Sequence, residues 1–129
     1  MIKEIKDEEC EIVKGWWAER GFPVIPRPAL PDDGFIAFVE GKPMMAGFLY
    51  FATSGASCWL AWVVGNPDSS FEERDEGFKI LTEYVESLSK SKGLMWLTIS
   101  NNNDNLIKKC ETLGYTVADK GSALVYKIL

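Results

Sequence analysis

The sequence predicts a single α/β domain, residues 1–129, in which a mixed, mostly antiparallel sheet of about six or seven strands carries helices on both faces. Its length suffices for one hydrophobic core and not for two. Short apolar runs bounded by turn residues alternate with stretches whose apolar residues recur at helical spacing. The predicted order is strand, helix, extended loop, three-strand meander, long helix, strand, short helix and two strands. The strands together are expected to form one sheet.

The N-terminal third is predicted to contain an edge strand, a helix and a stiff loop. Residues 1–5 form the strand, and Asp7 is expected to cap a helix that ends at Gly21. Residues 22–31 carry four prolines, whose fixed φ favours an extended connector over a helix or a central strand.

The middle of the chain is predicted to form the meander and the long helix. Strands are expected at residues 35–40 and 44–51, joined by a hairpin, and at residues 58–64, whose apolar run suggests burial on both faces. Ser70 followed three residues later by Glu73 is a capping-box pattern, which predicts that the long helix begins there.

The C-terminal third combines a strand, a polar loop and a short helix. Residues 94–99 are expected to form a buried strand, and the asparagine-rich run 101–105 to start a helix that Gly114 ends. Residues 115–118 and 123–129 are predicted to be the final strands. A polar loop between a strand and a helix is a typical place for a binding site in α/β folds.

Composition excludes several classes of function. A net charge of −5 argues against a nucleic-acid binder and is compatible with a cationic or amine-bearing partner. The absence of histidine removes Ser-His and Cys-His nucleophile pairs and histidine metal sites, and we expect no bound metal. Three widely spaced cysteines indicate free thiols in the cytoplasm, and neither a membrane span nor a signal peptide is apparent.

Several local patterns occur in the same order as in one known superfamily. They are the turn 40–43 followed by Gly47, the apolar run 61–64, Asn103 placed seven residues before Cys110, the run 110–115 (Cys-Glu-Thr-Leu-Gly-Tyr), and the apolar tail 125–129. With the order of elements, they make the chain resemble the GNAT N-acetyltransferase superfamily over almost its whole length. The resemblance implies acetyl-CoA as co-substrate, with backbone groups near Val63 and Val64 holding the thioester and Asn103 contacting the cofactor.

The pyrophosphate loop departs from the family pattern. The family uses Gln/Arg-x-x-Gly-x-Gly/Ala, and Arg74 and Gly77 are the nearest match, but Lys79 replaces the last small residue and several neighbours are acidic. The residues themselves favour a helix that begins near Ser70 and already contains this segment. An anion would then bind at Asn66, Ser69 and Ser70 with the first free N–H groups of the helix; the alternative is a capped surface helix with no anion site.

The catalytic residues implied by the resemblance also have structural alternatives. Cys110 occupies the position of a family tyrosine that protonates the departing thiolate, and it is alternatively a small core residue of a helix. Residues 57–64 hold no carboxylate, so Glu40 is the candidate base, directly or through a water, unless it is only a turn residue.

Aromatic residues are the candidates for contacting the amine acceptor. In GNAT proteins the first helix and the loop after it line the binding site of the amine acceptor. The aromatic residues of these segments here are Trp16, Trp17 and Phe22, and Trp62 of the apolar run 61–64 is a fourth candidate. They could hold an aromatic or cationic acceptor, or they could fill the core.

Two functions remain open. The first is an acyl-CoA-dependent N-acetyltransferase that transfers an acetyl group to an amine of a small molecule or a protein. The alternative is a catalytically inactive GNAT-fold binding or interaction protein, which the acidic phosphate region and Cys110 favour. Aromatic residues and the apolar final strands are compatible with a homodimer.

Overall fold

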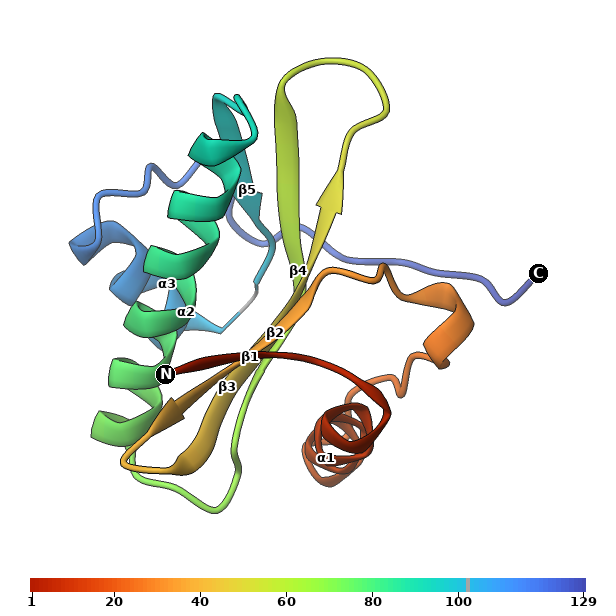
Figure 1. Ribbon diagram of the computed structural model, residues 1–129, viewed down its shortest axis with the longest axis vertical. Helices are drawn as coiled ribbons and strands as arrows, with labels where there is room; N and C mark the ends of the chain where they lie inside the picture. Colours follow the sequence, from red (N-terminus) through yellow and green to blue (C-terminus); the bar gives the residue numbers. More distant parts are fainter. Residues whose placement is uncertain (102) are drawn as a thin grey trace.

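A computed structural model describes residues 1–101 and 103–129; Asn102, in the middle of the predicted polar loop, lies outside the described residues. The described chain forms one five-stranded sheet in the order β1-β2-β3-β4-β5, with α1 on one face and α2 and α3 on the other (Figure 1). The elements are β1 (Ile2–Glu4), α1 (Asp7–Glu19), a 3-10 turn (Arg27–Ala29), β2 (Gly34–Val39), β3 (Lys42–Phe51), β4 (Ser57–Gly65), α2 (Phe71–Ser91), β5 (Trp96–Ile99) and α3 (Asp104–Thr112).

The strands pair in a mixed pattern. β1 through β4 are antiparallel to their neighbours, and β5 runs parallel to β4. The long helix α2 supplies the crossover that a parallel connection requires. The α/β class and the helices on both faces are therefore confirmed.

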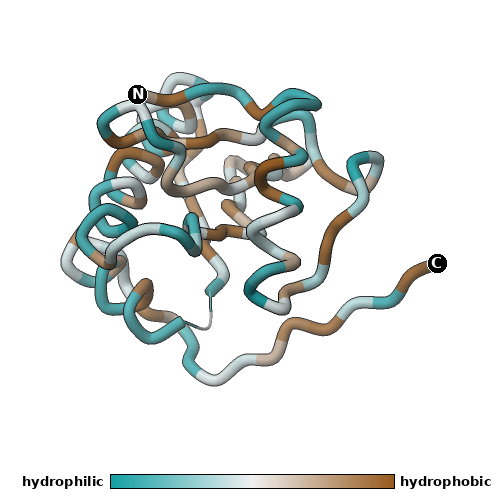
Figure 2. The backbone as a smooth tube through the Cα atoms, turned by 90° about the horizontal axis from the view of Figure 1, so that it is seen from below, coloured by the Kyte–Doolittle hydropathy of each residue, from teal (hydrophilic) through white to brown (hydrophobic). Residues whose placement is uncertain are grey.

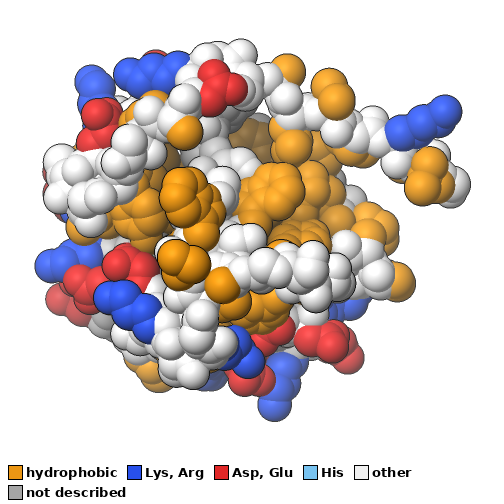
Figure 3. Space-filling view, turned by 90° about the horizontal axis from the view of Figure 1, so that it is seen from above, with side chains coloured by type: hydrophobic (Ala, Val, Ile, Leu, Met, Phe, Trp, Pro, Cys, Tyr) orange, Lys and Arg blue, Asp and Glu red, His pale blue; other side chains and the backbone are white. Residues whose placement is uncertain are grey.

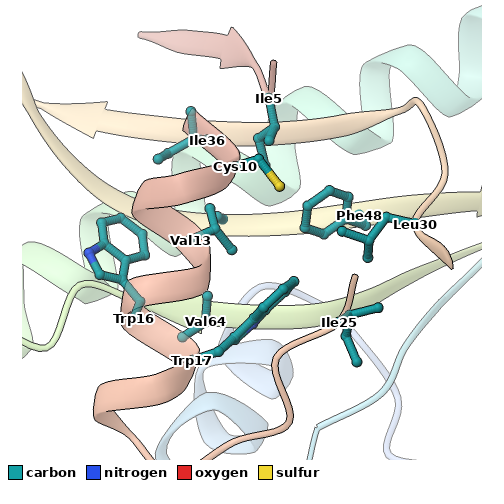
Figure 4. Close-up of a cluster of buried hydrophobic side chains, with 11 residues drawn as sticks. Ile5, Cys10, Val13, Trp16, Trp17, Ile25, Leu30, Ile36, Phe48 and Val64 are labelled. Carbon is teal, nitrogen blue, oxygen red and sulfur yellow. The ribbon is translucent and has the colours of Figure 1, made fainter. Parts of the chain in front are cut away.

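The core on the α1 face forms because α1 presents one apolar stripe to the sheet. Val13 and Trp17 point from α1 toward Phe48 of β3, and Ile25 and Leu30 of the proline-rich loop close the side of the cluster (Figure 4). The Trp17 and Phe48 rings are 5.8 Å apart between centroids. The loop therefore belongs to this domain and is not a linker.

The core on the opposite face forms between α2 and the sheet. Phe78, Leu81 and Val85 recur at helical spacing and are fully buried against β3 and β4 residues such as Leu49 and Leu60. α3 packs at the margin of this cluster through partly buried side chains.

Most predicted boundaries agree with the structure. Gly21, Gly93 and Gly114 follow the three helices with φ of 72°, 76° and 92°, the left-handed conformation that glycine adopts without strain. One capping prediction is wrong: Asp7 is the first residue of α1, and Lys6 is the N-cap residue, whose backbone N–H donates to the Glu9 carboxylate.

The predicted six or seven strands are too many, because residues 115–118 and 123–129 form no strand in the structure. The expectation that residues 94–99 form a buried strand is also wrong, since β5 lies at the open edge of the sheet and Trp96 is 68% exposed. Both errors have one cause, namely that no strand among the described residues pairs with the outer edge of β5. None of the helices in the described part of the chain combines the length and apolarity that a membrane crossing requires.

Candidate functional site

The most unusual feature of the sheet is a gap that opens between β4 and β5. The two strands pair from Ser57 opposite Trp96 to Leu60 opposite Ile99, and the pairing ends there. β4 continues for five more residues to Gly65. The β5-facing edge of this continuation has no strand beside it among the described residues, so its backbone polar groups can accept a ligand.

A β-bulge lies in β4 where the gap opens. Ala46 of β3 pairs with Val64 and Phe48 pairs with Ala61, so two residues of β4 stand opposite Gly47 alone. One of these two is Trp62, whose φ of 57° is rare for a bulky side chain. Such a conformation costs on the order of 1–3 kcal/mol and persists only where its surroundings hold it.

Two hydrogen bonds hold the bulge in place. The Trp17 indole Nε1–H of α1 donates to the Trp62 carbonyl oxygen at 3.2 Å, and the Trp62 indole donates to the Tyr50 hydroxyl at 3.0 Å. Gly47 lies opposite the bulge, and a Cβ there would lie 2.9 Å from a methyl carbon of Leu60, so a side chain at this position would require Leu60 to shift. The side chains of Val63 and Val64 pack into the two cores, which leaves mainly their backbone for a ligand in the gap.

The loop from β4 to α2 is held by its own polar side chains. Asn66 is buried, its amide donates to the Pro43 carbonyl, and its side-chain oxygen accepts from the Asp68 N–H. The Ser69 hydroxyl donates to the Asn66 carbonyl. The predicted anion-binding side chains Asn66 and Ser69 therefore already have structural partners.

The first turn of α2 has the predicted capping box. The Ser70 hydroxyl accepts from the Glu73 N–H, and the Glu73 carboxylate accepts from the Ser70 N–H at 2.9 Å. That backbone hydrogen bond is the main cause that lowers the pKa of Glu73. A negative charge thus already occupies the helix N-terminus, where it interacts favourably with the helix dipole.

Two arginines meet beside this turn, and only one of them was predicted. Arg74 donates to the Ser69 carbonyl at 2.6 Å, and Arg20, at the end of α1, donates to the Gly65 carbonyl at 2.9 Å. Burial, and then the charge of Arg74, lower the pKa of Arg20, so the two cations are close enough to repel each other. An anion between them would relieve that repulsion. Arg20 and Arg74 are more than fifty residues apart, and no local pattern pairs them.

Gly77 has a packing role. It is buried inside α2, and a Cβ there would lie 2.9 Å from Met44 Cβ and 3.3 Å from Met45 Cβ. The segment that resembles a phosphate loop is therefore a continuous helix that lies tightly on β3. Gly77 faces the sheet, and it cannot contact an anion at the first turn.

Cys110 lies on α3 at the margin of the core between α2 and the sheet. Burial raises the pKa of its thiol, so the thiol stays protonated at neutral pH. Tyr115 follows the end of α3, and its hydroxyl donates to the Glu86 carboxylate of α2 at 2.9 Å. Burial and then this hydrogen bond raise the pKa of Tyr115 strongly.

No protein-family model matches the chain, and no curated protein matches it either. Solved structures do match. A probable acetyltransferase has a TM-score of 0.69 at 12% identity, over 100% of this chain and 98% of that chain. A transcriptional regulator from Bacillus halodurans C-125 has a TM-score of 0.68 at 12% identity, over 98% and 99%. Aminoglycoside N-acetyltransferase AAC(6')-Iy in complex with CoA has a TM-score of 0.65 at 17% identity, over 100% and 99%.

The chain has the GNAT fold. The likeness in topology extends over the whole chain, whereas the identity is too low to transfer residues or substrates. In this GNAT-fold protein, the bulge of β4 and the end of the β4–β5 pairing lie on the same strand, where β4 continues without β5 beside it.

The predicted acceptor aromatics divide between the core and the surface. Trp16 and Trp17 are buried beneath α1, while Phe22 is 45% exposed in the loop after α1. Sequence reasoning missed an aromatic surface beside the gap: Trp59 is 43% exposed, and its indole donates to the Ser100 hydroxyl at 2.6 Å. Seen from above, apolar side chains gather in the hollowed middle of the molecule (Figure 3). The strand periodicity of residues 57–65 could have placed Trp59 on this face.

Glu40 and Asn103 have local structural roles. Glu40 and Gly41 form the β2–β3 hairpin tip with φ of 51° and 78°, the signature of a type I′ turn. β3 and β4 lie between this tip and β5, so Glu40 is roughly 10 Å or more from the gap at about 4.8 Å per strand. The structure does not bring it to Cys110, and a base must lie within hydrogen-bond reach. The Asn103 side chain caps α3 by accepting from the Asn105 and Leu106 N–H groups.

Proposed function

We propose that this protein is an acyl-CoA-dependent N-acetyltransferase that transfers an acetyl group from acetyl-CoA to an amine of a small molecule or a protein. The observation that carries the proposal is the gap between β4 and β5, which the bulge at Trp62 opens. It supplies backbone groups without a ladder partner between two strands of the sheet, and an extended pantetheine-like chain can pair with such groups as a strand would. The acetyltransferases among the structural neighbours support the same choice.

The phosphates of the co-substrate would lie at the start of α2. Free N–H groups of the first turn and the dipole favour an anion there, and Arg20 and Arg74 add two positive charges. Glu73 opposes them, because its carboxylate is fixed at the same helix end. We therefore propose a phosphate site in which the two arginines outweigh one capping carboxylate.

Acetyl transfer requires an N–H donor for the carbonyl, a neutral amine and a proton for the leaving thiolate. Backbone N–H groups near Val63 and Val64 would polarise the carbonyl. Cys110 holds a proton at neutral pH because its environment is apolar, and we propose it as the acid. We propose no side chain as the base, since Glu40 is remote; a water at the mouth of the gap would accept the proton of the amine.

A second function is favoured by one specific observation. The capping box places the Glu73 carboxylate where the phosphates would bind. If that charge prevents binding, the fold serves as a binding or interaction module. One structural neighbour described as a transcriptional regulator is consistent with such use of a similar fold.

Calorimetric titration with acetyl-CoA separates the two functions. We expect binding, weakened by Arg74→Gln and strengthened by Glu73→Gln, which keeps the hydrogen bonds of the capping box and removes its charge. Glu76→Gln removes an equal charge one turn further along α2 and serves as the matched control, with little effect expected. Absence of binding at millimolar acetyl-CoA would refute the enzyme function.

The role of Cys110 is tested separately, once an amine acceptor gives measurable release of CoA thiol. Cys110→Ser replaces the thiol with a hydroxyl, which is a weaker acid but still carries a proton, and Cys110→Ala removes the proton donor. We expect both variants to lose turnover, with the alanine variant losing more. Turnover and pH profiles like those of the wild type in both variants would remove Cys110 as the acid and leave it a packing residue.

A further inference from the structure

An open cavity lies on the α1 face of the sheet, beside the point where the β4–β5 gap begins. Its volume is about 340 Å³, and its lining includes Tyr50, Trp59 and Thr98. These three residues stand opposite one another on β3, β4 and β5, so their side chains share one face. Tyr50 packs at the margin of the core on the α1 side, which identifies that face. The volume falls in the range of small-molecule sites, about 300–1,000 Å³.

The cavity is open to solvent and therefore to a ligand. The chain end projects away from the body of the molecule (Figure 1, Figure 2), and none of the described residues after Thr98 lines the cavity. β4 has a strand on each side, yet Trp59 in it is 43% exposed. An aromatic ring left exposed within a sheet offers a large apolar contact to a bound molecule.

The Trp59 indole is held in place before any ligand arrives. Its Nε1–H donates to the Ser100 hydroxyl at 2.6 Å, across the strand pair. The Tyr50 ring lies 6.5 Å from it between centroids, tilted by 49°, and the Tyr50 hydroxyl accepts from the Trp62 indole at 3.0 Å. A side chain that is already ordered loses little conformational entropy on binding. Trp59 is therefore a preorganised surface for a flat partner.

Charge selects the kind of molecule that suits this cavity. The chain carries a net charge of −5, but none of the described residues that line the cavity is charged. An ammonium group placed there would lose water without gaining a carboxylate partner, which is unfavourable. A neutral aromatic ring meets no such cost, and it gains by packing against the Trp59 ring, offset or edge to face. The cavity therefore favours the ring of an aromatic amine over a polycation.

We propose that this cavity holds the acceptor of the acetyl group, and that the acceptor is a primary amine joined by a short chain to a flat aromatic ring that packs on Trp59. The inference rests on the proposed function and adds the substrate class to it. Trp59 stands one residue before the last β4–β5 pair, so at about 3.3 Å per residue the gap opens within roughly 7 Å of it. A ring on Trp59 therefore leaves its amine directed toward the gap.

The transfer balances with the groups already placed. The amine nitrogen attacks the thioester carbon, a C–N bond forms and the C–S bond breaks, which gives an amide and the CoA thiolate. The water at the mouth of the gap takes a proton from the nitrogen, and Cys110 gives one to the thiolate and regains it from solvent. Because the cavity supplies no charge to hold an ammonium group, it favours the neutral amine that the attack requires.

Two amines that differ only in the ring test the proposal. Calorimetry compares the binding of 2-phenylethylamine and 2-cyclohexylethylamine, each with and without saturating CoA. The saturated ring is at least as apolar, so a surface that only excludes water would not favour the phenyl compound. Packing on an aromatic ring does favour it, and we expect about two-fold to ten-fold tighter binding. In turnover assays, kcat/KM for the phenyl compound should likewise exceed the values for the cyclohexyl compound and for spermidine, a polycation without a ring.

Variants of Trp59 locate the preference. Trp59→Leu keeps an apolar side chain without a ring, so the two amines should bind with nearly equal affinity. Trp59→Phe keeps a ring and should retain the preference for the phenyl compound. Tyr84→Leu is the matched control, because Tyr84 is 37% exposed on α2 and packs on Phe35 at the opposite face of the sheet. It should leave the preference unchanged, and circular dichroism checks that each variant folds.

Three outcomes would overturn the proposal. They are equal or tighter binding of the cyclohexyl compound, a preference that survives in Trp59→Leu, and no binding of either amine at millimolar concentrations with or without CoA. The proposed function fails in a different way, by absence of acetyl-CoA binding. A preference that depends on Trp59 in a protein that does not bind acetyl-CoA would leave an aromatic-amine site without the enzyme. Binding of acetyl-CoA without that preference would leave the enzyme without this substrate class.

Discussion

Replacing Gly77 with alanine tests how closely α2 approaches the sheet. The added Cβ would lie 2.9 Å from Met44 Cβ and 3.3 Å from Met45 Cβ, and neither atom can turn away because each is attached directly to the β3 backbone. α2 must therefore shift, at a cost of about 1–3 kcal/mol for overpacking. Alanine also gains about 1 kcal/mol over glycine in a helix, so the net loss of stability should be about 0–2 kcal/mol.

Gly15→Ala is the matched control, because it makes the same change inside α1. Gly15 is exposed, and nothing lies within 4 Å of the position of its added Cβ. We expect this variant to be more stable than the wild type by up to about 1 kcal/mol. The helix-propensity gain is common to both variants, so the difference between them isolates the overpacking cost of about 1–3 kcal/mol.

Urea unfolding followed by tryptophan fluorescence measures both variants. With a slope of about 1–3 kcal/mol per molar urea, their midpoints should differ by on the order of 1 M. In thermal melts the difference corresponds to about 3–5 °C per kcal/mol for a chain of this size. Equal stabilisation by Gly77→Ala and Gly15→Ala would refute the close packing of α2 on β3 and would reopen a role for Gly77 at an anion site.

The remaining predictions concern the Ser70 cap of α2 and the hydrogen bond between Tyr115 and Glu86. Ser70→Ala should cost about 1 kcal/mol in urea unfolding, and Ser70→Gly only a few tenths; equal stability of the alanine variant and the wild type would contradict the capping box with Glu73. Tyr115→Phe should cost roughly 1–2 kcal/mol at neutral pH through the lost hydrogen bond to Glu86. The folded-state pKa of Tyr115 is raised, so its stabilisation is full below the unfolded pKa of about 10 and falls as the pH rises above it. The wild type should therefore lose stability above pH 10 more steeply than Tyr115→Phe in urea titrations, and parallel pH curves would argue against the half-buried hydrogen bond between Tyr115 and Glu86.

Local elements of this protein followed from its sequence. Helix and strand positions depend on short-range periodicity and on terminal residues, so α2 was expected to begin after Ser70 and α3 among the asparagines, as the structure shows. The Glu40–Gly41 turn and the glycines that end the helices were predictable for the same reason, since only their own φ values decide them.

The tertiary structure decided which residues meet. The positive φ of Trp62 depends on α1, because the Trp17 indole holds its carbonyl from 45 residues away. Arg20 and Arg74 come together only when α1 and α2 pack at the same end of β4. The sequence likewise predicted strands at residues 115–118 and 123–129, but it could not supply a partner edge for them. Sequence determined the elements because their hydrogen bonds and caps are local, whereas the gap, the paired arginines and the open β5 edge arise from contacts between distant segments.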